Sequence, residues 1–258
     1  MLYPTSLSDD SWTFIKPIFE SYGVFEKGRV HSIRLIVDAV FYVVDNGTKW
    51  RNLPNDFPPW KTVYHHFSTW SKQGLWPRIN LVLVESVRFA SGREESPSLA
   101  SIDSQSQCAE PGIIGRGLDG NKKRNGRKRH IAVDVNGLVL GCICTPANES
   151  DVHAGYLLAK ELNNEAIFPR LKKILGDNAY TSVGSDLAVP VSVEAAERKP
   201  GQKGFVPEAF RWAVERTFAW LNRQRRVARN YEKNHLHQES MNFVANIRLC
   251  LKRLMKWF

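Results

Sequence analysis

Residues 130–146 read HIAVDVNGLVLGCICTP. Two apolar runs flank Asn136-Gly137, a dipeptide that accepts the positive φ angles of the tight turns between antiparallel strands. This stretch therefore predicts a β-hairpin and places a sheet in the second half of the chain.

Further segments of the second half have the pattern of strands or helices. Short apolar runs bounded by turn residues predict strands, whereas apolar residues at intervals of three and four predict helices. The predicted strands are 99–106, 171–180 and 187–195, and the predicted helices are 148–163, a long helix from about 207, and 241–258. Pro190 is typical of an edge strand. The order of these elements predicts a mixed sheet covered by helices, an α/β (α+β) fold.

The first half of the chain has the pattern of helices only. Ser8 is a candidate N-cap, and Gly47 is a stop signal after an apolar stripe. Val63, Phe67 and Trp70 form the buried stripe of a later helix. A helix, a Pro-rich turn and an aromatic, basic helix predict a small helix-turn-helix domain, with a plain helical bundle as the alternative.

The polar stretch SGREESPS at 91–98 separates these two halves. Gly, Pro and Ser concentrate there, as is typical of a linker, and no internal repeat crosses it. We expect a helical, DNA-binding domain at 1–92 and a catalytic domain at 98–258.

The composition indicates an anionic partner. The formal net charge is +10, which favours a polyanion such as nucleic acid. The four cysteines form no C-x-x-C pair and no zinc-spaced cluster, which indicates a reducing, cytoplasmic compartment. We see no secretory signal and no apolar run long enough for a membrane span.

Three carboxylates could meet at the predicted sheet. Asp103 lies in the first strand, Asp177 follows the fourth, and Glu215 lies in the long helix. If the first and fourth strands are neighbours, the two aspartates become adjacent, and a helix packed there could deliver Glu215. Such acids would repel each other unless cations lay between them, and Mg²⁺ or Mn²⁺ suits oxygen ligands beside phosphate.

Each acid also has a purely structural interpretation. Asp103 could be a buried, hydrogen-bonded residue, Asp177 could belong to a turn, and Glu215 could pair with Arg211 four residues earlier. Asp134, expected to face solvent in the hairpin, and Asp151, expected in the first turn of a helix, are further candidates. Spacing alone does not select three acids.

Helical geometry favours a role for Glu215 in RWAVERTFAWLNRQRRVAR, residues 211–229. Val214, Phe218 and Leu221 form one apolar stripe, and Glu215 lies on its flank. Trp212, Trp220 and Val227 form a second apolar patch. The polar strip between them, which consists of Arg211, Glu215, Asn222 and Arg226, should therefore face a groove. Arginines in this strip suit phosphate recognition.

The expected DNA contacts are basic. The segment GRGLDGNKKRNGRKRH at 115–130 concentrates positive charge close in sequence to Asp103, with a flexible charged loop as the alternative. The predicted contacts are Lys61, His65, Lys122, Lys123, Arg124, Arg127, Lys128, Arg129, Arg211, Arg216, Arg223 and Arg226.

The motifs SIDSQS, GRKRHIAVDVNGLVLGCICTPANESD, LGDNAY and RWAVERTFAWLNRQRR together resemble the DDE transposases of the insertion-sequence-five family. The resemblance spans nearly the whole chain, from about Leu7. It implies an RNase-H-like core with Asp103, Asp177 and Glu215 as the metal-binding triad. The wider group places Tyr and Lys around the Arg–Glu pair, whereas this chain has Glu208 and Asn222 there.

The resemblance implies an endonuclease that cuts DNA at insertion-sequence ends and transfers the strand into target DNA. It further implies two Mg²⁺ ions, with Mn²⁺ as a substitute, terminal inverted repeats as partners, a homodimer in the DNA complex, and a cytoplasmic, nucleoid-associated location in a bacterium. Arg223 or Arg226 could replace the missing Lys. The alternatives are a non-catalytic DNA-binding protein, such as a co-opted or inactive transposase, and a nuclease that cuts without joining.

Overall fold

The sheet of this protein mixes parallel and antiparallel strands. The computed structural model describes residues 3–177, 180, 192–195 and 211–256. The strands are β1 (Leu99–Cys108), β2 (Gly117–Asp119), β3 (Arg124–Val133), β4 (Val139–Pro146), β5 (Lys173–Gly176) and β6 (Ser192–Ala195). They lie in the order β2-β3-β1-β5-β6, and β4 also pairs with β3. The predicted mixed sheet is confirmed, and β6 takes the predicted edge position.

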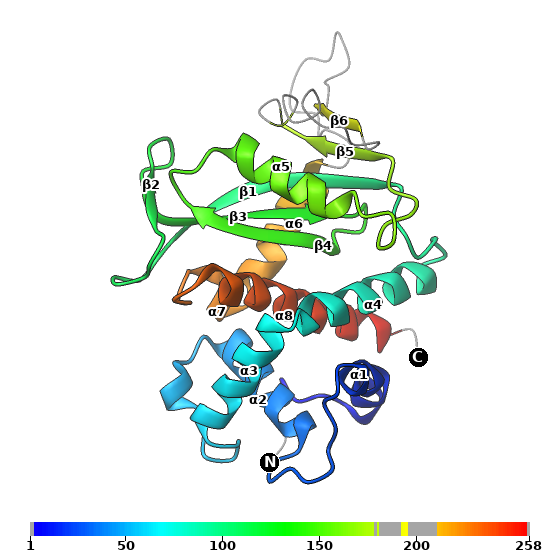
Figure 1. The fold of residues 1–258 in the computed structure, drawn as a ribbon, viewed down its shortest axis with the longest axis vertical. Helices are drawn as coiled ribbons and strands as arrows, with labels where there is room; N and C mark the ends of the chain where they lie inside the picture. The colour runs from blue at the N-terminus through cyan, green and yellow to red at the C-terminus, as the bar shows by residue number, and fades with distance from the viewer. Residues whose placement is uncertain (1–2, 178–179, 181–191, 196–210, 257–258) are drawn as a thin grey trace.

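Helices cover this sheet and form a separate layer beyond it (Figure 1). They are α1 (Asp9–Ser21), α2 (Ile33–Asn46), the 3-10 helix η1 (Trp50–Asn52), α3 (Trp60–Lys72), α4 (Leu75–Ala90), α5 (Asp151–Leu162), α6 (Arg211–Asn222), α7 (Arg225–Ala228) and α8 (His235–Leu254). A curled mixed sheet flanked by helices, after an all-helical first segment, agrees with the RNase-H-like fold.

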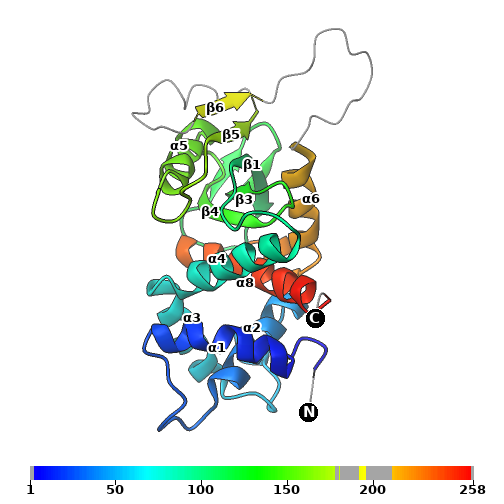
Figure 2. The same cartoon turned by 90° about the vertical axis from the view of Figure 1, so that its right-hand side faces the viewer.

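The two faces of the sheet have different covers. Strand β1 pairs with β5 in parallel, and parallel neighbours need a crossover connection rather than a tight turn. Helix α5 lies within that connection and packs on β3 and β4. Figure 2 shows α5 and α6 on opposite sides of the sheet. The face opposite α5 is therefore the one over which α6 lies.

The predicted hairpin is present, and its turn is anchored by a buried acid. Gly137 has the predicted positive φ of 75°. The Asp134 carboxylate accepts hydrogen bonds from the backbone N–H groups of Asn136 (2.9 Å) and Leu138 (2.8 Å) and forms an ion pair with Arg88 of α4. Asp134 is 1% exposed, so the expectation that it faces solvent is wrong. A carboxylate can be buried there because the turn amides and a guanidinium replace its water.

Helix α4 belongs structurally to the layer beneath the sheet. It packs along α8 and against β4. The Asn80 side-chain amide donates to the backbone oxygen of Val139 at 2.8 Å, and Asn246 of α8 donates to Asn80 at 2.7 Å. One hydrophobic cluster runs from Leu7 in the first helical segment to Leu254 in α8. The helices and the sheet therefore share a core across the polar stretch 91–98.

The first helices begin and end as the sequence predicts. The Ser8 hydroxyl accepts from the backbone of Ser11, and α2 ends at Gly47 with a φ of 68°. Val63, Phe67 and Trp70 are buried, as their spacing predicts. No helix among the described residues is long and apolar enough to span a membrane.

The long helix expected from about residue 207 to Arg229 is interrupted. Its residues before Arg211 lie outside the described part of the chain, α6 ends at Asn222, and a short separate helix, α7, follows. Val227 and Arg226 therefore do not continue the faces of α6, and the expected polar strip ends at Asn222.

We predict that Asp134→Asn lowers the free energy of unfolding by about 3 kcal/mol, because it leaves the buried Arg88 guanidinium without its counter-ion. Urea denaturation at neutral pH measures this loss. Asp9→Asn is the control, since it breaks the Arg34–Asp9 pair, in which the Asp9 side chain is 90% exposed. Equal losses in both variants would show that burial of the Arg88–Asp134 pair does not matter.

Candidate active site

Two of the three predicted acids lie on adjacent parallel strands. Ser101 of β1 is the register partner of Leu175 in β5. Asp103 and Asp177 each follow these residues by two positions, so continuation of the same register sets them side by side on one face. The strand pairing on which the sequence prediction depended is therefore present.

The charges of both aspartates also act on one buried side chain, that of Tyr180. Tyr180 is 1% exposed. Burial first, and then the nearby carboxylates of Asp151, Asp103 and Asp177, raise the pKa of Tyr180. Asp103 and Asp177 therefore both lie close enough to the Tyr180 phenol to affect its pKa. Asp103 and Asp177 are themselves half-buried, and the Asp103 carboxylate accepts a hydrogen bond from the backbone of Ser104 at 2.7 Å.

The side chains of β1 show which face the aspartates occupy. Gln107 donates to the backbone oxygen of Val227 in α7 at 2.6 Å, and Gln105 accepts from Asn222 of α6 at 3.4 Å. Because side chains alternate along a strand, Asp103 shares this face with Gln105 and Gln107. The two aspartates therefore lie on the α6 side of the sheet.

Helix α6 places Glu215 over that face, since α6 packs on β1 and β3. Val214, Phe218 and Leu221 are buried, as predicted, whereas Glu215 is exposed. Glu215 precedes Asn222 by two helical turns, and so it points to nearly the same side of α6. No group of three His, Cys, Asp or Glu side chains positioned to hold a metal ion occurs within the described residues.

The structure gives Asn222, at the position where the wider group has Lys, a defined contact. Its side-chain oxygen accepts from the Arg129 guanidinium at 2.8 Å, and its amide nitrogen donates to Gln105. The end of α6 is thereby attached to β3 and β1. The sequence did not reveal this contact, because the three residues are far apart along the chain.

The predicted DNA contacts divide by exposure. Lys61, His65, Lys122, Lys123, Arg124 and Arg223 are exposed. Lys128 is half-buried and pairs with Asp151 at 3.0 Å. The side chain of Arg211 lies outside the described residues.

Three arginines predicted to touch DNA are buried instead. Arg127, Arg129 and Arg226 are 1%, 0% and 6% exposed. Their guanidinium groups donate to oxygens of the chain, among them the backbone oxygen of Val227 for Arg129 and the carboxylate of Glu232 for Arg226. They cannot meet phosphate from these positions, so the prediction of DNA contact is wrong for all three.

The exposed cations Lys122, Lys123 and Arg124 are carried by a turn between β2 and β3. The buried Asp119 carboxylate accepts from the backbone of Asn121 and Lys122, both at 3.0 Å, and from the Ser106 hydroxyl. The Ser106 hydrogen bond, followed by these backbone N–H groups, lowers the pKa of Asp119. Neither β2 nor a role for Asp119 is predicted from the sequence, although Asp119-Gly120 is itself a turn signal.

Arg216 lies in an aromatic stack on α6. Its guanidinium carbon is 4.0 Å from the Trp212 ring centroid and 4.5 Å from that of Trp220, and Arg253 of α8 covers Trp220 at 4.6 Å. These residues line a pocket of about 520 Å³. Arg216 is half-buried rather than free to extend into solvent.

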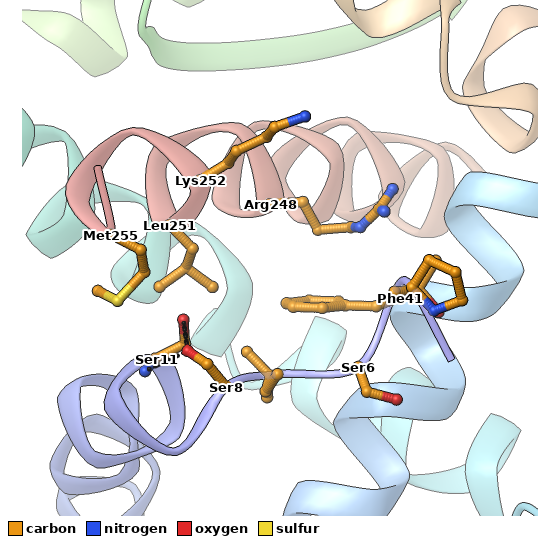
Figure 3. Close-up of a pocket in the computed structure, with 11 residues that line it drawn as sticks. Ser6, Ser8, Ser11, Phe41, Arg248, Leu251, Lys252 and Met255 are labelled. Carbon is orange, nitrogen blue, oxygen red and sulfur yellow. Dashed lines mark hydrogen bonds between the residues drawn. The ribbon is translucent and has the colours of Figure 1, made fainter. Parts of the chain in front are cut away.

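Among the further pockets of the described residues, two lie beside α8. One of about 330 Å³ is lined by Ser6, Ser8, Ser11, Arg248 and Lys252, among others, from the start of α1 and from α8 (Figure 3). The other, of about 590 Å³, is lined by residues of α4, β4, α5 and α8, including Glu239. Neither contains a predicted site residue, so the acids on the sheet remain the candidate active site.

The fold and the paired aspartates define a protein of the RNase-H-like class. A family model described as "Putative transposase of IS4/5 family" matches residues 7–80, and two models of a transposase DDE domain match residues 94–187 and 182–252. Together these matches support a DDE transposase of the IS4/5 type.

One curated relative points to the same family. It is named "Putative transposase for insertion sequence element IS402", from Burkholderia cepacia, and is 31% identical over 126 residues. The match covers 44% of this chain and 57% of the relative, so the chain spans little more than half of that protein's length. No solved structure matches the chain.

We predict a pH-dependent stability difference between the wild type and Glu239→Gln. Burial raises the pKa of Glu239 to about 7, against the lowering effect of a hydrogen bond from the backbone of Cys144. A carboxyl with a raised folded-state pKa stabilises the fold below its unfolded pKa and loses that contribution as the pH rises to about 7.

The variant should match the wild type at pH 4 and be more stable by about 1–2 kcal/mol at pH 8. Urea denaturation across this range measures the difference, and the exposed Glu165→Gln is the control. A constant difference from pH 4 to pH 8 would show that Glu239 is not held protonated by the fold.

Proposed function

We propose that this protein cuts DNA at the ends of an insertion sequence and joins the released 3′-hydroxyl to target DNA. The observation that carries the proposal is the parallel pairing of β1 and β5, which sets Asp103 and Asp177 side by side beneath the helix that bears Glu215. The matches to models of a transposase DDE domain support it. Both steps are phosphoryl transfers, and neither needs a covalent enzyme intermediate.

The acids suit Mg²⁺, with Mn²⁺ as a substitute. Mg²⁺ in phosphoryl-transfer sites takes one or two carboxylates and otherwise water and substrate phosphate, so two adjacent aspartates suffice for a first ion. Glu215 is exposed on the helix over the same face and would complete a two-ion site with bound DNA. Two bound ions would activate the attacking water and stabilise both oxygens of an in-line displacement.

The exposed cations supply the contacts to the DNA backbone. Lys122, Lys123 and Arg124 project from a turn that Asp119 holds in shape, and Arg223 directly follows the helix of Glu215. Lys61 and His65 of α3 would bind the same DNA further along. These contacts carry affinity rather than sequence choice. Terminal inverted repeats and target DNA are the substrates, and a homodimer on the bacterial nucleoid would cut two ends together.

We predict that Asp103→Asn, Asp177→Asn and Glu215→Gln each reduce nicking of labelled element ends by more than about a hundredfold. Each change removes a charge that holds the metal, and metal stabilisation of the transition state contributes several kcal/mol. The measurement is strand cleavage with Mg²⁺ or Mn²⁺, beside a gel-shift assay for DNA binding.

Asp151→Asn is the matched control, because Asp151 begins α5 on the opposite face of the sheet. It should cut as the wild type does. Cleavage at wild-type rates by Asp103→Asn or Glu215→Gln would refute the triad. DNA binding by the wild type without metal-dependent cleavage would leave the non-catalytic alternative, and cleavage without strand transfer would leave a nuclease.

We predict that replacing Lys122, Lys123 and Arg124 together with alanine lowers the slope of log affinity against log salt by about 2–3, since each phosphate contact contributes about 0.9. Fluorescence anisotropy with duplex DNA at several salt concentrations measures this slope. A charge-matched control replaces the exposed Lys16, Lys27 and Arg29. Equal losses in the two triple variants would mean that affinity follows net charge and not the β2–β3 turn.

A further inference from the structure

We propose that the buried Arg129 is the positioning residue that fixes helix α6 against strand β1, and thereby Glu215 against Asp103, an inference that rests on the proposed function of these acids. Arg129 lies on β3 and is 0% exposed, and its guanidinium donates to Gln105, Asn222, Asn242 and the backbone of Val227 rather than to either acid. It would act through its partners on the two elements that carry them.

The Arg129 guanidinium joins four segments of the chain. Its Nη2 donates to Gln105 Oε1 of β1 at 2.6 Å and to Asn222 Oδ1 of α6 at 2.8 Å. Its Nη1 donates to the backbone oxygen of Val227 at 3.1 Å and to Asn242 Oδ1 of α8 at 2.9 Å. The planar Arg129 guanidinium therefore fixes the positions of β1, α6, α7 and α8 relative to one another.

These contacts lie in register with the candidate catalytic acids. Gln105 follows Asp103 by two residues and so shares its face of β1. Asn222 follows Glu215 by two helical turns and so shares its side of α6. The guanidinium also lies 5.2 Å from the ring centroid of Phe218, three residues after Glu215. Helix α6 is thus held at two points along the stretch that follows Glu215.

The partners of Arg129 are neutral oxygens. The planar arrangement of its N–H donors therefore contributes more to these contacts than ion pairing does. A lysine has one nitrogen and cannot bond all four segments at once. Burial lowers the pKa of Arg129 to about 10, which leaves the group protonated and all of its N–H donors in place at neutral pH.

Arg127 provides a matched comparison on the same strand. It is 1% exposed, two residues from Arg129 and on the same face of β3. Its guanidinium donates to the backbone oxygens of Ile114, Glu232 and Lys233, none of which lies on β1 or α6. Loss of Arg127 should disturb the core to a similar degree without moving Glu215 relative to Asp103.

The test measures Mn²⁺ binding by electron paramagnetic resonance on the full chain with element-end DNA, beside the midpoint of thermal unfolding. Arg129→Lys should weaken Mn²⁺ binding by about tenfold or more, the usual effect of removing a residue that orients metal ligands. Arg127→Lys should lower the unfolding midpoint comparably and leave Mn²⁺ affinity within about twofold, well below that usual effect.

Two milder variants keep the test decisive if Arg129→Lys folds poorly. Asn222→Ala and Gln105→Ala each cut one link to the guanidinium at a partly exposed position, and each should weaken Mn²⁺ binding several-fold. The double variant should do no more than the stronger single one, because both act through one network. Arg225→Ala, an exposed change three residues beyond Asn222, is their control.

The outcomes separate this inference from the proposed function. If the wild type neither binds Mn²⁺ with DNA nor cleaves, the proposed function fails and the inference with it. If the wild type does both but the Arg129, Asn222 and Gln105 variants bind Mn²⁺ like their controls, the proposed function stands and the positioning role is overturned.

Discussion

The parallel pairing of β1 with β5 is the constraint on which the rest of the structure depends. Parallel neighbours cannot be joined by a tight turn, so the chain between them crosses one face of the sheet and leaves α5 there. The opposite face is then the one over which α6 lies, while α4 and α8 pack against strand β4. The same pairing places Asp103 and Asp177 at matching positions of neighbouring strands. One strand pairing therefore determines both which helix covers each face of the sheet and where the two aspartates meet.

Much of this arrangement follows from local sequence signals. The Asn136-Gly137 hairpin, helix α5, the edge strand β6 and the buried stripe of α6 are all found where the residue patterns predict them. The adjacency of Asp103 and Asp177 could be stated in advance only as a condition, because strand order is not a local property. Pairing of strands distant in sequence depends on the whole core rather than on either segment.

The wrong predictions concern polar residues whose partners are distant in sequence. Asp134 is buried because Arg88 approaches from α4, and Arg129 is buried because Gln105 and Asn222 approach from β1 and α6. A run such as GRKRH shows that charge is abundant but not which side chains find internal acceptors. The formal charge of +10 therefore includes arginines that stabilise the fold and are not available to DNA.

The burial of α8 has a consequence for how the protein is made. Thirteen residues of this helix are buried, and α8 packs against both α4 and β4. Since α8 follows every strand in the chain, a ribosome has synthesised the sheet before the helix that covers β4 exists. Until then apolar surface on α4 and β4 stays open to water, where it favours aggregation. The core can thus close only after α8 has been synthesised, which links the assembly of the acids to the synthesis of that helix.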